Sequence, residues 1–124
     1  MGDMCQLAQR WRIAQELAFK LQDMAHRLPY QVSIISGYRS VEEQNVLIEE
    51  GKGAPLNRST HVTCPATGAD LWVAVAVTDV VKAVFGEAAV SSGLRWGGGS
   101  SVDPQTGIPS DWNHVDLGPR RDTL

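Results

Sequence analysis

Apolar residues recur at three- and four-residue steps in two parts of the chain, and short β-branched runs lie between them. The first pattern is typical of amphipathic helices and the second of strands. We expect long helices at about residues 4–28 and 78–89, and a shorter helix that begins at Ser40 and stops at Gly51. The expected strands are 31–36, 69–73, 94–96 and 112–117.

Capping signals support these boundaries. Asp3-Met4-Cys5-Gln6 and Ser40-Val41-Glu42-Glu43 both have the capping-box spacing that begins a helix. Pro29 ends the first helix, and Gly51 is a typical residue just after the end of another.

Glycine- and proline-rich stretches at 51–68 and 97–110 are expected to be loops. No repeat, linker or change in composition divides the chain. We therefore predict a single domain over residues 1–124, with motifs between about 31 and 117 and a tail at 118–124. The order of helices and strands predicts a small α+β fold, with helices packed on an antiparallel sheet.

Composition excludes several classes of function. The chain has 124 residues, of which 43% are apolar and 20% charged, and its net charge is -3. These values are ordinary for a globular domain and give no basic footprint for nucleic acid. No apolar run is long enough to cross a membrane. We also expect a monomer. The N-terminus lacks a basic segment followed by an apolar one, so we expect synthesis in a cytoplasm without a signal peptide.

The two cysteines, Cys5 and Cys64, are too few for a disulfide scaffold, and the sequence leaves open whether they pair. Cys64 is close in sequence to His61, but its spacing fits none of the compact cysteine-rich zinc patterns.

Two histidines and one aspartate have the residue types of a catalytic metal site. His61, Asp70 and His114 would supply two imidazoles and a carboxylate, which leaves one position of a tetrahedral zinc ion for water. Zinc lowers the pKa of such a water toward ~7. Spacing alone also allows a capping role for Asp70 and structural roles for the histidines.

Three further charged residues are candidates for roles around this site. Asp111 could act as a general base on the metal-bound water, or cap the turn after Pro109-Ser110. Asp116 could accept a hydrogen bond from the His114 ring, act as a fourth ligand, or contact solvent. Arg39 could bind a developing oxyanion or a substrate carboxylate, or form a structural ion pair.

Taken in order, these segments resemble the zinc D-Ala-D-Ala dipeptidase and carboxypeptidase family, and especially its L-alanyl-D-glutamate endopeptidase branch in phages and bacteria. The resemblance runs from about Gln31 to Leu117. It is carried by the ordered set of short motifs Gly37-Tyr38-Arg39-Ser40 with Gln44, Ser59-Thr60-His61, Gly68-Ala69-Asp70-Leu71-Trp72, Arg95-Trp96-Gly97-Gly98 and Asp111-Trp112-Asn113-His114-Val115-Asp116.

The resemblance implies the fold shared by Hedgehog domains and D-Ala-D-Ala peptidases, with one zinc ion held by His61, Asp70 and His114. It implies Asp111 as the general base and Arg39 as the group that stabilises the tetrahedral intermediate. The remaining implied residues surround the site: Ser59 and Tyr38 contact substrate, and Gln44 supports the site from outside the ligand set.

Three positions depart from the family pattern. His61 and Asp70 are nine residues apart where the family usually has seven, so residues 62–67 must bulge outward for both to reach one metal. The base is Asp111, as in the endopeptidase branch, where the dipeptidase branch has glutamate. Gly99 stands where the endopeptidase branch commonly has aspartate after the two glycines.

The resemblance implies a zinc peptidase that hydrolyses a D-amino-acid-containing bond in peptidoglycan stem peptides, of the endopeptidase or D-Ala carboxypeptidase type. Such a protein would act on the cell wall after release or export, and a phage lysin fits this expectation. A zinc-stabilised binding module without catalysis, as in Hedgehog domains, is the main alternative. An iron oxygenase is disfavoured, because no carboxylate lies two positions after His61.

Overall fold

The computed structural model describes residues 4–99 and 111–118, with the side chains of residues 4–6 outside the description. The helices are α1 (Met4–Trp11), α2 (Gln15–Arg27), α3 (Val41–Glu49) and α4 (Asp79–Ser91). The strands are β1 (Val32–Ser36), β2 (Gly68–Val73), β3 (Arg95–Trp96) and β4 (His114–Asp116). The predicted α+β fold with an antiparallel sheet is therefore confirmed.

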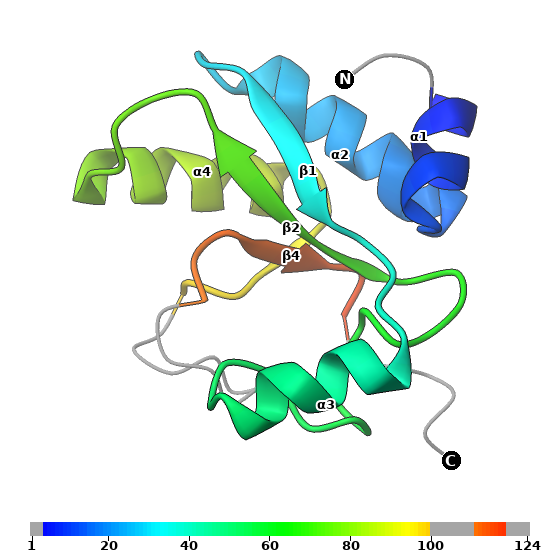
Figure 1. The fold of residues 1–124 in the computed structure, drawn as a ribbon. Coiled ribbons are helices and arrows are strands. Elements are labelled where there is room, and N and C mark those ends of the chain that lie inside the picture. Colours follow the sequence, from blue (N-terminus) through cyan, green and yellow to red (C-terminus); the bar gives the residue numbers. More distant parts are fainter. Residues whose placement is uncertain (1–3, 100–110, 119–124) are drawn as a thin grey trace.

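The sheet has the strand order β1-β2-β4-β3, and each neighbouring pair is antiparallel. Helices α2 and α4 lie behind the sheet in Figure 1, whereas α3 lies apart from them, across β4. The apolar core is contributed mainly by α2, α4, β2 and β4, and includes Leu17, Leu21, Met24, Leu71, Phe85, Ala89 and Val115.

Alternation along the central strands sends apolar and polar side chains to opposite faces. Leu71 and Val115 are buried in the core, so their sequence neighbours Asp70 and His114 point to the other face. The antiparallel register pairs Asp70 with His114 directly, and Asp116 with both Gly68 and Arg95. The sheet therefore gathers polar side chains on the face away from its main core.

The expected single helix at 4–28 is wrong in one respect, because the structure breaks it after Trp11. Arg12 has a left-handed φ of 52°, and Ile13 forms a parallel bridge with Ala66. The backbone at the break is paired with that same residue, since Ala66 N donates to Arg12 O and Ala14 N donates to Ala66 O, both at 2.8 Å. The apolar spacing continues across the break, with Ile13 3% exposed, so periodicity alone does not reveal it.

The capping signal at Ser40 forms as predicted. Ser40 Oγ accepts from Glu43 N, and Glu43 Oε1 accepts from Ser40 N, both at 3.1 Å. This capping box fixes the start of α3 directly after Arg39. The equivalent pattern at Asp3 lies outside the described residues, as do most of the expected 97–110 loop and the 118–124 tail. Within 4–99 and 111–118, none of the helices has the length and apolar character needed to cross a membrane.

Candidate metal centre

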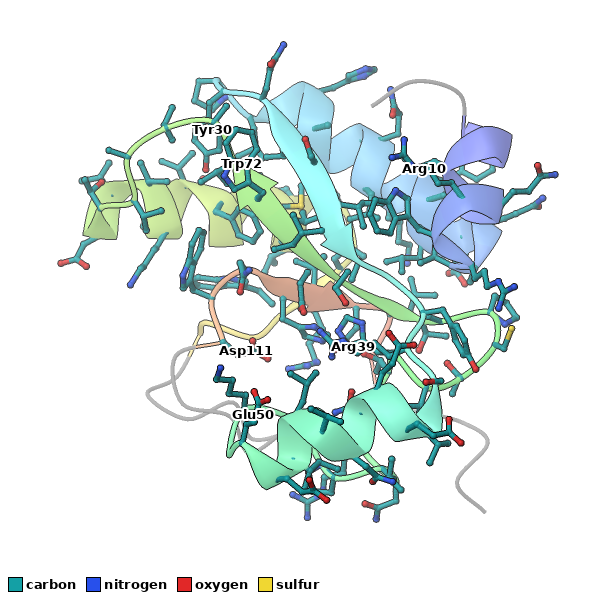
Figure 2. All side chains as sticks on the ribbon, viewed as in Figure 1. Arg10, Tyr30, Arg39, Glu50, Trp72 and Asp111 are labelled. Atoms are coloured by element: carbon teal, nitrogen blue, oxygen red, sulfur yellow. The ribbon has the colours of Figure 1, made fainter. Side chains whose placement is uncertain are left out.

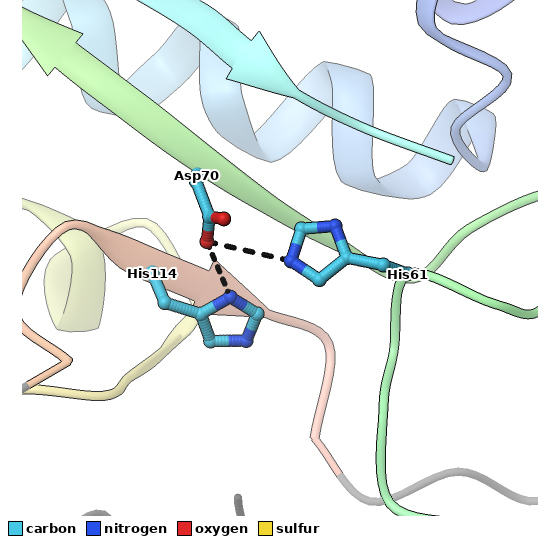
Figure 3. A group of neighbouring side chains, drawn as sticks. All are labelled: His61, Asp70 and His114. Atoms are coloured by element: carbon cyan, nitrogen blue, oxygen red, sulfur yellow. Dashed lines mark hydrogen bonds and ion pairs between the residues drawn. The ribbon is translucent and has the colours of Figure 1, made fainter. Parts of the chain in front are cut away.

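The structure brings His61, Asp70 and His114 together at one point, as the sequence predicts (Figure 3). His114 Nδ1 lies 2.9 Å from Asp70 Oδ1, and His61 Nε2 lies 3.4 Å from the same oxygen. The two imidazole rings are 5.2 Å apart between centroids. One nitrogen from each histidine and one carboxylate oxygen therefore converge, which is the donor set of a catalytic zinc site.

Two strands and one loop position these three side chains. Asp70 and His114 are cross-strand partners on β2 and β4, so sheet register alone places them side by side. His61 comes from the loop before β2 and is tied to the start of α3, because Arg39 N donates to His61 O at 2.8 Å. His61 N also donates to Ser59 Oγ at 3.3 Å.

The longer spacing between His61 and Asp70 is absorbed by an outward loop. Thr67 N donates to Thr60 O at 3.0 Å, which closes the base of the loop. Cys64 and Pro65, joined by a cis peptide bond, are exposed at its far side. The two additional residues therefore leave the convergence of the ligands intact. Cys64 is a free thiol among the described side chains, and the predicted alternative of a bond to Cys5 concerns a side chain outside the description.

The remaining nitrogen of each histidine is bound on the side away from the cluster. His61 Nδ1 lies 2.6 Å from Gly37 O, and His114 Nε2 lies 2.8 Å from Asp116 Oδ2. A ring nitrogen that donates to such an acceptor leaves the opposite nitrogen as the lone-pair donor toward a metal. His61 Nε2 and His114 Nδ1 are thus oriented as ligands, and the donors present fit zinc.

Asp116 is fully buried and takes hydrogen bonds at both oxygens. Oδ1 accepts from Arg95 Nε at 2.9 Å and from Gly118 N at 2.8 Å. Oδ2 accepts from the second Arg95 nitrogen and from His114. Asp116 therefore contacts the ring nitrogen of His114 that faces away from Asp70, and it is not among the three side chains that converge. Burial raises the pKa of Asp116, but its hydrogen bonds to His114 and Arg95 outweigh this and lower the pKa.

Both nitrogens of His114 face carboxylate oxygens, those of Asp70 and Asp116. Burial disfavours the charged ring, but the hydrogen bonds to Asp116 and Asp70 outweigh it and raise the pKa of His114 to about 10. Burial likewise raises the pKa of Asp70, but hydrogen bonds from His114 and His61 hold it well below its usual range. A metal ion that binds Nδ1 of His114 would therefore compete with a proton for that nitrogen.

Arg39 lies against the same carboxylate from the other side. One of its terminal nitrogens donates to Asp70 Oδ2 at 2.7 Å, and the other donates to Gln44 Oε1 at 3.2 Å. Gln44 is 1% exposed, and its amide nitrogen donates to Ala54 O at 2.9 Å. Gln44 therefore fixes the guanidinium, while Asp70 keeps Oδ1 toward the histidines.

The cluster opens into a pocket between the sheet and α3. Asp111, Arg39 and Ser59 all line this pocket with the three candidate ligands. Figure 2 shows Asp111 and Arg39 between the sheet and α3. Tyr38 instead lines a neighbouring hollow, together with Trp11 and Val46.

Sequence reasoning missed three contributors to the site. Arg95 lies in one of the predicted motifs without a predicted role, yet its ion pair with Asp116 follows from their antiparallel register. Thr60 Oγ1 lies 3.4 Å from His114 Nε2. Lys52 lines the pocket although it follows α3 in a loop, and no spacing rule points to it.

The sequence matches no family model and no curated protein. The fold, however, is similar to solved peptidase structures. The L-Ala D-Glu endopeptidase ChiX of Serratia marcescens has a TM-score of 0.65 at 19% identity, over 95% of this chain and 89% of that protein. A variant of the vancomycin resistance D,D-pentapeptidase VanY in complex with Zn(II) has a TM-score of 0.58 at 17% identity, over 86% of this chain and 73% of that protein.

A third structure, the vancomycin resistance D,D-dipeptidase VanXYg with a D-Ala-D-Ala phosphinate analog, has a TM-score of 0.52 at 19% identity. The match covers 90% of this chain and 52% of that protein. These similarities confirm the expected fold: the chain shares its architecture with an L-Ala D-Glu endopeptidase and two D,D-peptidases.

Proposed function

We propose that this protein is a zinc-dependent peptidase that hydrolyses a D-amino-acid-containing bond in peptidoglycan stem peptides. The observation that carries the proposal is the orientation of the two histidines. Each turns one nitrogen toward Asp70 and binds an acceptor through the other, at a pocket that also holds Asp111 and Arg39. The similar structures of an endopeptidase and two D,D-peptidases support the substrate class.

His61, Asp70 and His114 would hold one zinc ion. When bound, zinc supplies a water of lowered pKa and polarises the scissile carbonyl. Asp116 keeps His114 oriented through Nε2, and Gln44 keeps Arg39 against Asp70. These supporting contacts hold the donor atoms in place before substrate arrives.

Asp111 and Arg39 would perform the proton and charge steps. Asp111 accepts a proton as water oxygen bonds to the carbonyl carbon, and returns it to the leaving nitrogen as the C–N bond breaks. Arg39 donates a hydrogen bond to the carbonyl oxygen while that oxygen gains negative charge. Ser59 would contact substrate at the pocket wall, and Tyr38 would contact a more distant part of it in the neighbouring hollow.

We favour an endopeptidase or D-Ala carboxypeptidase that works as a monomer on the cell wall, after release or export. A digest of purified sacculi tests this. Zinc-loaded protein and its Asp111→Asn variant are incubated with sacculi of several wall types, and released fragments are identified by mass spectrometry. The Asp23→Asn variant, at an exposed site on α2, serves as the matched control.

New L-Ala or D-Glu termini would identify an endopeptidase, and free D-Ala a carboxypeptidase. Either product should be lost with Asp111→Asn and kept with Asp23→Asn. Zinc-bound, folded protein that releases no fragment from any wall would overturn the proposal and favour a binding module.

A further inference from the structure

Among the described residues, one arginine and one lysine line the pocket at the metal cluster, Arg39 and Lys52, and they differ in how firmly they are held. Arg39 has 18% of its side chain exposed and is held by Asp70 and Gln44. Both terminal nitrogens donate to fixed acceptors, so the guanidinium is held beside Asp70, and its remaining N–H groups are those assigned above to the carbonyl oxygen of the scissile bond. A free carboxylate elsewhere on the substrate would therefore need another cation.

Lys52 meets that need because its backbone is fixed and its ammonium group is exposed. Lys52 N donates to Leu47 O at 2.8 Å, and Gly53 N donates to the same carbonyl at 3.2 Å, which anchors the backbone at the end of α3. The side chain is 70% exposed and pairs with Glu50 at 3.3 Å, where Glu50 is itself 47% exposed. Exposed pairs of this kind contribute little to stability, so Lys52 can exchange Glu50 for another carboxylate.

The place of this pair in the fold also fits a substrate contact. Glu50 lies at the end of α3 that faces Asp111 (Figure 2). Lys52 and Asp111 both line the pocket, as does the metal cluster. A carboxylate held by Lys52 would thus sit within the same pocket as the bond to be cut.

Resting on the proposed peptidase function, we infer that Lys52 is a specificity-determining residue, which binds a free carboxylate of the stem peptide next to the scissile bond. Two carboxylates share this chemistry: the α-carboxylate of D-Glu, which is left free by the γ-linkage, and the C-terminal carboxylate. The inference predicts that the enzyme discriminates against stem peptides in which the bound carboxylate is amidated.

Two matched pairs of synthetic stem peptides test the inference. In one pair the D-Glu α-carboxylate is free or a primary amide, and in the other the C-terminus is free or a primary amide. For whichever of the two carboxylates Lys52 binds, the wild-type protein should prefer the free acid over the amide by about tenfold in kcat/KM, as expected for one charge-assisted contact. Lys52→Met should reduce that preference to within about twofold, Lys52→Arg should retain it, and Lys20→Met, on α2, should leave it unchanged.

Binding gives a second readout that does not require turnover. The zinc-loaded Asp111→Asn variant should bind the free acid about tenfold more tightly than the amide, and addition of Lys52→Met should abolish the difference. Cleavage by the wild type with equal preference, or a preference unchanged by Lys52→Met, would overturn the inference and leave the peptidase proposal standing. Neither cleavage nor binding of any of the four peptides would instead count against the peptidase proposal itself.

Discussion

Replacing Asp116 by asparagine should weaken both the fold and the metal site, although Asp116 does not face the metal. Each carboxylate oxygen accepts two hydrogen bonds, one of them from Arg95 in each case. An amide in either orientation turns an NH₂ group toward two donors. Asp116 is fully buried and the Arg95 side chain is 23% exposed, so water cannot freely replace the lost hydrogen bonds at either oxygen position. Two lost buried bonds at ~1–3 kcal/mol each predict a loss of about 2–6 kcal/mol in unfolding free energy.

The same substitution removes the acceptor that orients His114. Outer partners of this kind are worth about 10–100-fold in metal affinity, so we expect zinc to bind Asp116→Asn that much more weakly. Denaturant titration of the zinc-free protein measures the stability loss. Competition with a chelator of known affinity measures the zinc loss.

Asp23→Asn is the matched control, since Asp23 also pairs with an arginine but is 50% exposed. It should cost less than about 1 kcal/mol and leave zinc affinity unchanged. If Asp116→Asn binds zinc within twofold of the wild type, the supporting role assigned to Asp116 is refuted.

Three further predictions concern the same site. In the zinc-free protein the raised pKa of His114 stabilises the fold, and this contribution is fully present below pH ~6.5 and should be lost as pH rises toward 10. The free energy of unfolding, measured by denaturant titration at several pH values, should fall over this range. Zinc binding at neutral pH should release about one proton from His114, measured by calorimetry in buffers of different ionisation enthalpy; no proton release would contradict the protonated state. Gly68→Ala should destabilise the fold by ~1–3 kcal/mol and weaken zinc binding, because the new Cβ would meet Thr60 and lie 2.9 Å from His114 Cε1. Gly99→Ala serves as the control for a glycine substitution, because its new Cβ would meet nothing nearer than 3.9 Å.

Local sequence signals predicted the elements well because they depend on short-range chemistry. The capping box at Ser40 and the strands at β1 and β2 are examples. The break after Trp11 was not predictable in this way. It depends on a long-range backbone pairing between Ile13 and Ala66, and the apolar spacing runs through it unchanged.

The convergence of His61, Asp70 and His114 was predicted from residue types and a family resemblance, and the structure explains it through the register of β2 and β4. The roles assigned to Arg39 and Asp111 stay predictions. Lys52 was missed because its place in the pocket depends on how the end of α3 folds back on Leu47, which no motif encodes.

A zinc titration of the metal-free protein tests the central claim most directly. Bound metal and cleavage of one synthetic stem peptide are measured in the same samples. The account predicts that both rise together and saturate at one zinc per chain, and that His61→Ala abolishes both. Cleavage that persists without metal, or a fully occupied site with no cleavage of any stem peptide, would contradict it.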